Sequence, residues 1–166
     1  MIFKGNTLKL GDNINTDFII SGRYKFSITD IKELSKHIME DIEPDFSKKI
    51  VPGASILVAG KNFGMGSSRE QAPLVIKASG IVAVLAQSFA RIFFRNAFNV
   101  GLLLIETDTS NILEQDLLEI NLDKGVVKNL TKSIELQIKP LPPVMQEFLN
   151  EGGVVAYIKK HGALKL

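Results

Sequence analysis

The chain has 166 residues, of which 45% are hydrophobic, and its formal net charge is +2. This composition predicts one folded domain over residues 1–166 with a substantial core and argues against a disordered chain. Because the net charge is small and no apolar run reaches membrane-spanning length, we expect a soluble, cytoplasmic protein that binds neither nucleic acid nor membrane.

The sequence contains no cysteine and only two histidines, His37 and His161, which lie in unrelated segments. Without cysteine the chain forms no disulfide and offers no thiolate to a catalytic step or to an iron–sulfur cluster. Two distant histidines give little support to a metal site or to a local Ser/His/Asp triad. We therefore predict no metal on this chain and, if it is an enzyme, a second component that supplies part of the chemistry.

The N-terminal third predicts a strand over residues 7–10, a turn, and a polar loop that runs to residue 20. An amphipathic helix is predicted over residues 29–42, because apolar residues recur there at helical spacing and Asp30 and Glu33 occupy capping-box positions. His37 lies on the polar face of this predicted helix.

The centre of the chain alternates short apolar runs with helix-forming segments. The predicted strands cover residues 56–59, 81–86 and 102–105, and the predicted helices cover residues 68–79 and 88–96. This alternation predicts parallel strands joined by right-handed crossovers.

The C-terminal third changes to a two-residue period. Residues 117–121 and 125–138 read as strands, with a hairpin turn at residues 123–125, and helices are predicted over residues 144–151 and 154–160. An antiparallel addition to a parallel sheet follows, which predicts an α/β fold with a mixed sheet.

Residues 60–70 (GKNFGMGSSRE) are the most informative segment, because they join a predicted strand to a predicted helix start. Ligands of open α/β sheets bind at the carboxyl ends of strands, and a helix start offers unpaired N–H groups to an anion. Gly64 and Gly66 would let a ligand approach the backbone, while Ser67 and Ser68 add hydroxyl groups. Arg69 adds a planar fork that matches a carboxylate.

The same spacing has other interpretations. Ser67 and Glu70 fit a capping box, which begins many helices that bind no ligand. A phosphate-cradling loop is disfavoured because the segment lacks the Gly-Lys-Ser/Thr ending, and Arg69 replaces the third glycine of a dinucleotide fingerprint. The density of glycines, hydroxyls and Arg69 favours a carboxylate site.

Four segments together resemble the aconitase-type hydro-lyases, namely residues 11–17, 22–24, 60–70 and 88–96. Their order and spacing agree over nearly the whole chain. Within this superfamily the chain resembles the family of separate 3-isopropylmalate dehydratase small subunits, which are similar to the C-terminal domain of aconitase. The chain departs from residues that are frequent in the family, Pro, Cys and His, at Ser21, Met65 and Gln71.

The resemblance implies a swivelling three-layer β/β/α domain with a mixed, partly parallel central sheet. It also implies a large-subunit partner that carries a 4Fe-4S cluster, in a heterodimer or heterotetramer, and a small hydroxy-dicarboxylic acid as substrate. The implied reaction isomerises 2-isopropylmalate and 3-isopropylmalate by dehydration and rehydration in leucine biosynthesis, with a Lewis-acidic iron that takes the leaving hydroxyl.

The resemblance assigns roles to individual residues. Ser67 is the implied catalytic base and Asp17 an active-site acid, although a loop aspartate also makes Asx-turns. Arg69 is expected to grip a substrate carboxylate, with Ser68 and Gly66 beside the same anion. A serine hydroxyl is a poor base at neutral pH, so Ser67 needs positive charge and N–H donors that favour its alkoxide-like state.

The resemblance also points to Arg23, Tyr24, Phe26, Arg91 and Arg95 as substrate-binding residues. Arg91 and Arg95 are spaced i and i+4, which places both at a cleft or both on an ordinary helix surface. The neighbouring phenylalanines at 89, 93, 94 and 98 are predicted to pack in the core.

The loop that follows Tyr24 is expected to read the substituent that distinguishes substrates. Homoaconitase-like relatives place an arginine at the position of Phe26, so an apolar substituent fits this chain better, although Lys25 could reach a carboxylate. Homoaconitase and alkyl-malate dehydratases, which act on dimethylmalate, methylmalate or citraconate, stay open as alternatives. Two other classes also stay open, a standalone anion- or nucleotide-binding module and an interaction-only scaffold.

Overall fold

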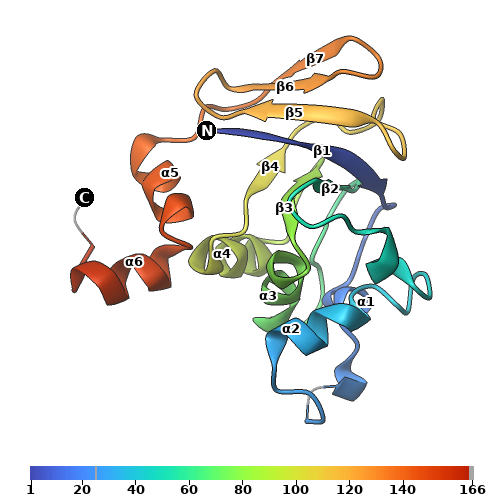
Figure 1. Cartoon of the computed structure of the whole chain (residues 1–166), viewed down its shortest axis with the longest axis vertical. Helices are drawn as coiled ribbons and strands as arrows, with labels where there is room; N and C mark the ends of the chain where they lie inside the picture. The colour runs from blue at the N-terminus through green and yellow to red at the C-terminus, as the bar shows by residue number, and fades with distance from the viewer. Residues whose placement is uncertain (25, 165–166) are drawn as a thin grey trace.

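The strands form one mixed sheet in the order β4-β3-β2-β1-β5-β6-β7 in this computed structural model, which describes residues 1–24 and 26–164 (Figure 1). The strands are β1 (Ile2–Lys9), β2 (Ser55–Val58), β3 (Ile81–Ala86), β4 (Leu104–Glu106), β5 (Leu117–Asn121), β6 (Val126–Asn129) and β7 (Ile134–Gln137). The helices are α1 (Thr16–Ile19), α2 (Ile31–Leu34), α3 (Gln71–Ala78), α4 (Arg91–Val100), α5 (Pro143–Asn150) and α6 (Val154–His161). Three 3-10 turns add η1 (Gly22–Tyr24), η2 (Ser35–His37) and η3 (Phe46–Lys49).

The predicted division of the sheet into a parallel and an antiparallel half is confirmed. Strands β1 to β4 pair in parallel, whereas β1, β5, β6 and β7 pair antiparallel. Strand β1 belongs to both halves, because Ile2 to Asn6 pair with β5 and Asn6 to Lys9 pair with β2. Strand β1 therefore joins the antiparallel half of the sheet to the parallel half.

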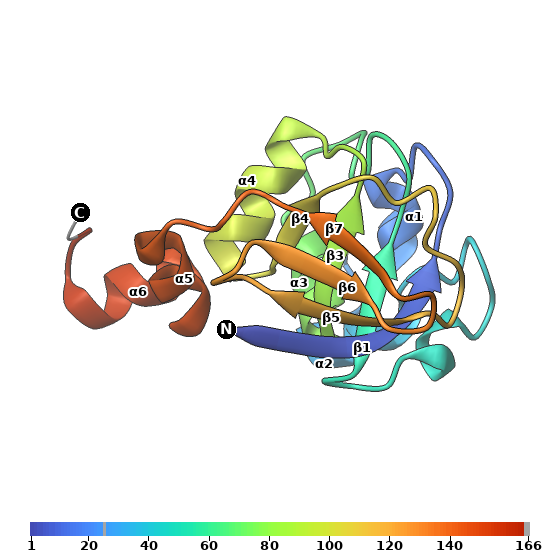
Figure 2. The same cartoon turned by 90° about the horizontal axis from the view of Figure 1, so that it is seen from above.

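Two hydrophobic cores separate three layers. On one face of β2 and β3, Leu57 and Val84 pack with Val75 of α3 and Phe93 of α4. On the other face the alternate residues of these strands pack against β5 and β6, in the group Ile56, Val58, Ala83, Leu85, Leu118, Ile120 and Val127. Figures 1 and 2 show β5, β6 and β7 folded over one side of β2 to β4, with α3 and α4 on the other. This is the expected β/β/α arrangement, and it explains why β2 and β3 are almost continuously apolar.

The helix predicted over residues 29–42 is wrong beyond its first turns. Asp30 caps α2 as expected, since its carboxylate accepts from the Glu33 N–H at 2.8 Å. The chain leaves the helical path after η2, and Met39 has a φ of 54° while its N–H donates to the Ile19 carbonyl at 2.9 Å. A contact with a distant loop thus overrides the helical pattern. The strand predicted over 125–138 is likewise two strands, because a turn with Ser133 at φ 56° separates β6 from β7.

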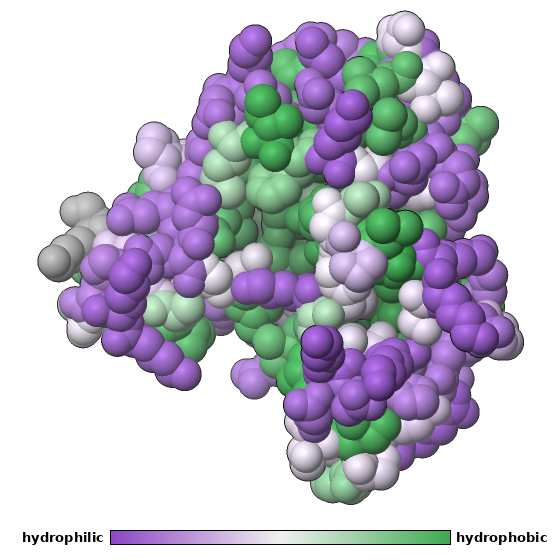
Figure 3. All heavy atoms as spheres, viewed as in Figure 1, coloured by the Kyte–Doolittle hydropathy of each residue, from purple (hydrophilic) through white to green (hydrophobic). Residues whose placement is uncertain are grey.

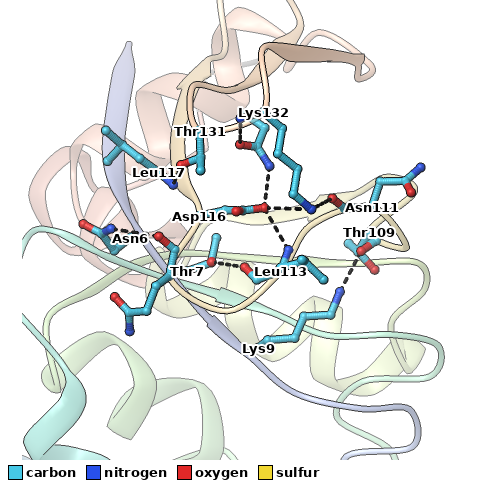
Figure 4. A network of polar contacts seen from close by, with 12 residues as sticks. Asn6, Thr7, Lys9, Thr109, Asn111, Leu113, Asp116, Leu117, Thr131 and Lys132 are labelled. Carbon is cyan, nitrogen blue, oxygen red and sulfur yellow. Dashed lines mark hydrogen bonds and ion pairs between the residues drawn. The ribbon is translucent and has the colours of Figure 1, made fainter.

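A buried carboxylate ties the β4–β5 connection to the antiparallel half (Figure 4). Asp116 is 4% exposed, and its Oδ2 accepts from the Leu113 N–H at 2.8 Å and from Asn129 Nδ2 at 2.7 Å, with Lys132 Nζ at 3.4 Å. In the same connection, the buried Thr109 hydroxyl donates to the Ala59 carbonyl at 2.7 Å. Because Ala59 lies between β2 and the segment that begins at Gly60, this connection also fixes the end of β2.

Helices α5 and α6 project beyond the rest of the molecule in both views (Figures 1 and 2). The face seen in Figure 3 carries a hollow with apolar walls between the β5–β7 layer and the helices. Among the described residues, no helix is both long and apolar enough to cross a membrane.

Candidate active site

Two loops at the carboxyl ends of β1 and β2 form the walls of the candidate site. Asn15 and Met65 form an isolated parallel bridge, the Thr16 N–H donates to the Met65 carbonyl at 2.9 Å, and the Gly64 N–H donates to the Ile14 carbonyl at 2.8 Å. A cavity of about 310 Å³ opens between these loops and the start of α4. Its lining includes five of the predicted site residues, Gly66, Ser67, Ser68, Arg69 and Arg91.

The helix start predicted at Ser67 and Ser68 is wrong. Helix α3 begins at Gln71, and its N-cap Glu70 makes no side-chain capping bond. The segment from Ser67 to Arg69 is therefore a loop, in which the Arg69 N–H donates to the Ser67 carbonyl at 2.8 Å. The expected capping box is absent, so Ser67 is not engaged in capping a helix.

Arg69 is oriented by two partners on the α1 side of the cavity. Its Nη2 lies 2.5 Å from Asp17 Oδ1, and its Nη1 donates to the Ile20 carbonyl at 3.0 Å. Asp17 is 54% exposed whereas Arg69 is 24% exposed, so the pair lies at the edge of the cavity. A guanidinium has five N–H donors, and these contacts leave donors for a second carboxylate.

Ser67 is contacted by Thr16, the first residue of α1. Thr16, which is 2% exposed, donates its hydroxyl to the Ser67 carbonyl at 2.9 Å, and its Oγ1 lies 3.4 Å from Ser67 Oγ. Asn15 caps α1 by accepting from the Asp17 N–H at 2.9 Å. The sequence predicted a polar loop here, and neither Asn15 nor Thr16 was singled out from it. The N-cap pattern of Asn15 was the available signal for the short helix.

The structure shows a packing requirement for glycine at positions 64 and 66, which is separate from the expected approach of a ligand to the backbone. Both have positive φ, 80° and 94°. A Cβ on Gly64 would lie 2.2 Å from Phe93 Cγ, and a Cβ on Gly66 would lie 2.5 Å from Asn15 Oδ1. The protein's own side chains occupy the space beside both glycines, so their absent side chains allow this loop to pack against α1 and α4.

The helix predicted over residues 88–96 starts three residues later, because Ser88 accepts the Asn62 N–H at 2.8 Å within the loop. Arg91 and Arg95 are both exposed on α4. Arg91 lines the Ser67 cavity and a neighbouring cavity of about 410 Å³, whereas Arg95 lines the neighbouring cavity and not the Ser67 cavity. The predicted core positions of Phe89 and Phe93 are confirmed, and Phe94, at 37% exposed, is an exception.

Arg23 and Tyr24 lie in a second polar cluster outside the cavity lining. Arg23 pairs with Glu40 at 2.6 Å and with Asp41, and the Tyr24 hydroxyl donates to Glu40. His37, expected on a polar helix face, stacks on Tyr24 with ring centroids 4.2 Å apart and places Nδ1 2.8 Å from Glu40.

Arg23, Tyr24 and Glu40 shift one another's pKa through their hydrogen bonds. The hydrogen bond with Glu40 raises the pKa of Tyr24. Burial opposes ionisation of Glu40, but hydrogen bonds from Tyr24, His37 and Arg23 outweigh it and lower its pKa. The Glu40 hydrogen bond also raises the pKa of Arg23. Phe26 is 90% exposed near this cluster in sequence, and Lys25 lies outside the described residues.

The arrangement can hold an anion and present a hydroxyl oxygen to it. Arg69 and Arg91 bring positive charge to a cavity that also contains the Ser67 and Ser68 hydroxyls. Among residues 1–24 and 26–164, no group of three or more His, Cys, Asp and Glu side chains could hold a metal ion.

This fold and cavity define a class, since residues 26–110 match the family of aconitase C-terminal domains. The chain is 56% identical over 162 residues to the 3-isopropylmalate dehydratase small subunit 2 of Archaeoglobus fulgidus, covering 98% of both chains. It is 52% identical to the 3-isopropylmalate dehydratase small subunit of Thermodesulfovibrio yellowstonii, and the match covers 96% of this chain and 95% of that relative. A crystal structure of 3-isopropylmalate dehydratase from Methanocaldococcus jannaschii superposes with a TM-score of 0.91, at 46% identity, over 98% of this chain and 96% of the other. The chain belongs to the family of 3-isopropylmalate dehydratase small subunits.

Proposed function

We propose that this chain is the small subunit of a hydro-lyase that isomerises 2-isopropylmalate and 3-isopropylmalate by dehydration and rehydration in leucine biosynthesis. The observation that carries the proposal is the near full-length similarity to small subunits of that enzyme, at up to 56% identity among the relatives described above. The cavity supports it, because Ser67 and Arg69 line one space of a size suited to a small dicarboxylic acid.

We assign Arg69 to the substrate carboxylate and Ser67 to proton abstraction. Asp17 and the Ile20 carbonyl orient the guanidinium before substrate arrives, which reduces the entropy lost on binding. The alkoxide of Ser67 takes the proton alpha to the carboxylate, so the C–H bond breaks, an O–H bond forms, and the electron pair stays on carbon. Arg69 stabilises the charge that builds on the carboxylate. Ser68, Gly66 and Arg91 stay proposed contacts of the same anion.

We infer that a large subunit completes the enzyme, as the naming of the relatives as small subunits implies. The residues of this chain do not fit a 4Fe-4S cluster, because the sequence has no cysteine and the described residues form no alternative ligand group. We therefore place the cluster on the large subunit, and we assign to this chain only the binding of the carboxylate and the removal of the proton. The cytoplasmic location, a single domain and its swivelling stay predictions.

The proposal is tested by reconstituting the chain with its large subunit and measuring turnover of 3-isopropylmalate, citraconate, dimethylmalate and homoaconitate. We expect the highest kcat/KM for 3-isopropylmalate. The chain alone should be folded, free of iron and inactive, and turnover by the chain alone would contradict the proposal.

The same assembly separates the other classes. A scaffold predicts full activity of Ser67→Ala and Arg69→Ala, and a nucleotide-binding module predicts thermal stabilisation by nucleotides and none by hydroxy acids. A higher kcat/KM for homoaconitate than for 3-isopropylmalate would favour the homoaconitase alternative. Phe26 does not support that alternative, because homoaconitase-like relatives place an arginine there.

A further inference from the structure

The Thr16 hydroxyl lies beside both oxygens of Ser67. It donates to the Ser67 carbonyl oxygen at 2.9 Å, and its Oγ1 is 3.4 Å from Ser67 Oγ. Thr16 is almost fully buried, yet it lines the same cavity as Ser67. The roles assigned above leave this hydroxyl unused.

The backbone of Thr16 is fixed on both sides. Its N–H donates to the Met65 carbonyl at 2.9 Å, and its carbonyl accepts from the Ile20 N–H at 3.1 Å. Asn15 caps the helix that Thr16 begins. Because the backbone is fixed and the residue is 2% exposed, the Thr16 side-chain oxygen has little freedom to move away from Ser67. The hydroxyl hydrogen can still rotate about the C–O bond.

A hydroxyl group has one hydrogen and two lone pairs, so its role depends on where the hydrogen points. While the Thr16 hydrogen is on the Ser67 carbonyl, a lone pair of Oγ1 is available to accept the Ser67 hydroxyl hydrogen. When Ser67 loses that proton to water, the Thr16 hydrogen can turn from the carbonyl to Ser67 Oγ. A hydrogen bond to an alkoxide is shorter and stronger than one between neutral groups, so the 3.4 Å separation is expected to contract in that state.

We propose that Thr16 is a positioning residue for Ser67, which orients the neutral hydroxyl and then donates a hydrogen bond to its alkoxide. This inference rests on the proposed role of Ser67 as the base. The alkoxide then has its remaining lone pairs directed into the cavity, where it breaks the substrate C–H bond and becomes a hydroxyl again. A base must present a lone pair to that hydrogen, and Thr16 secures this orientation.

The test compares Thr16→Val, which keeps the branched shape and removes the hydroxyl, with Thr16→Ser, which keeps the hydroxyl. Both are assayed in the assembly with the large subunit and 3-isopropylmalate. We expect Thr16→Val to lower kcat about tenfold, the effect of one hydrogen bond, with little change in KM. The acidic limb of its kcat–pH profile should move to higher pH, because the alkoxide loses a donor. Thr16→Ser should resemble the wild type in both respects.

A double-mutant cycle adds a readout that a purely structural role would not give. Thr16 acts through Ser67, so Thr16→Val should have no further effect on the residual kcat of Ser67→Ala. An unchanged kcat and pH profile in Thr16→Val, or an equal loss in Thr16→Ser, would overturn the proposal.

Folding is checked by circular dichroism and thermal unfolding. If Thr16→Val does not fold, Thr16→Ala takes its place, and failure of both to fold assigns Thr16 to the fold and also overturns the proposal. An inactive Ser67→Ala together with a fully active Thr16→Val would refute the role of Thr16 alone, whereas an active Ser67→Ala would refute the role of Ser67 as well.

Discussion

Replacing Asp116 by alanine should destabilise the protein, because one buried and one partly buried donor lose their acceptor. The Leu113 N–H and the Asn129 amide both donate to Asp116 Oδ2. Leaving the buried Asn129 amide unsatisfied costs about 1–3 kcal/mol, and losing the bond from the partly buried Leu113 N–H adds about 1 kcal/mol. The loss of the Lys132 ion pair adds little to this cost, since Lys132 is partly exposed and its Nζ still donates to the Asn111 carbonyl at 2.7 Å. We expect a loss of about 3 kcal/mol, and a melting temperature lower by about 6–12 °C for a chain of this size.

Asp116→Asn serves as the matched variant. All three donors converge on one oxygen, which an asparagine can also present, so this variant loses the charge while the contacts stay possible. Its loss should be about 1 kcal/mol. As a surface control, Asp123→Ala removes an exposed partner of the N-terminus and should change stability by less than about 1 kcal/mol.

The pH dependence follows from the sign of the pKa shift. Burial opposes ionisation of Asp116, but hydrogen bonds from Leu113 and Asn129 and the Lys132 charge outweigh it and lower its pKa. The stabilisation by the carboxylate is therefore complete above the unfolded pKa of about 4 and is lost as the pH falls through the lower, folded value. Urea unfolding between pH 7 and pH 2 measures it, and the gap between wild type and Asp116→Asn should close at the acidic end. A gap that stays constant over this range, or an Asp116→Ala as stable as the Asp123→Ala control, would refute the reasoning.

Three further predictions concern the assembled enzyme. Ser67→Ala should lower kcat by at least about 100-fold with little change in KM, because a base acts in the transition state; steady-state kinetics decide this. Arg69→Lys should raise KM more than it lowers kcat, since one ammonium cannot contact Asp17, the Ile20 carbonyl and a substrate carboxylate in the geometry of a fork; an unchanged KM would contradict the assignment. Phe26→Arg should shift the ratio of kcat/KM from 3-isopropylmalate toward homoaconitate by about 10-fold or more, and a constant ratio would show that this exposed residue does not read the substituent.

Most strands could be predicted because burial leaves a direct trace in the sequence. Strand β3 (Ile81–Ala86) and strand β5 (Leu117–Asn121) have the predicted bounds, the first as a continuous apolar run and the second as an alternating one. The failed helix over residues 29–42 had an equally regular pattern. Three of its apolar residues, Leu34, Ile38 and Met39, are indeed nearly inaccessible, whereas Ile42 is exposed. They are buried along an irregular path that a backbone contact to Ile19 fixes. Periodicity reports which residues are buried and not always which conformation buries them.

The candidate site was predictable as a set of residue types and not as a set of contacts. The loop over residues 60–70 was located correctly at the end of β2, and five of the proposed site residues line one cavity. The contact of Thr16 with Ser67 joins positions 51 residues apart, and that of Asp17 with Arg69 spans a similar separation. Because no local pattern encodes such contacts, Thr16 could not be recognised from the sequence. The Glu40 cluster around Arg23 and Tyr24 was missed for the same reason.

The corrected start of α3 changes where the attraction for an anion comes from. With the helix expected at Ser68, its first N–H groups and dipole would have met the carboxylate. Because α3 begins at Gln71, beyond the cavity lining, its dipole makes a smaller contribution at Ser67, since such effects fall off within the first turn. The positive charge at the cavity then rests on the side chains of Arg69 and Arg91. A guanidinium carries a full charge whose position depends on its partners, so Asp17 and the Ile20 carbonyl, which orient Arg69, become part of the means by which the site binds a carboxylate.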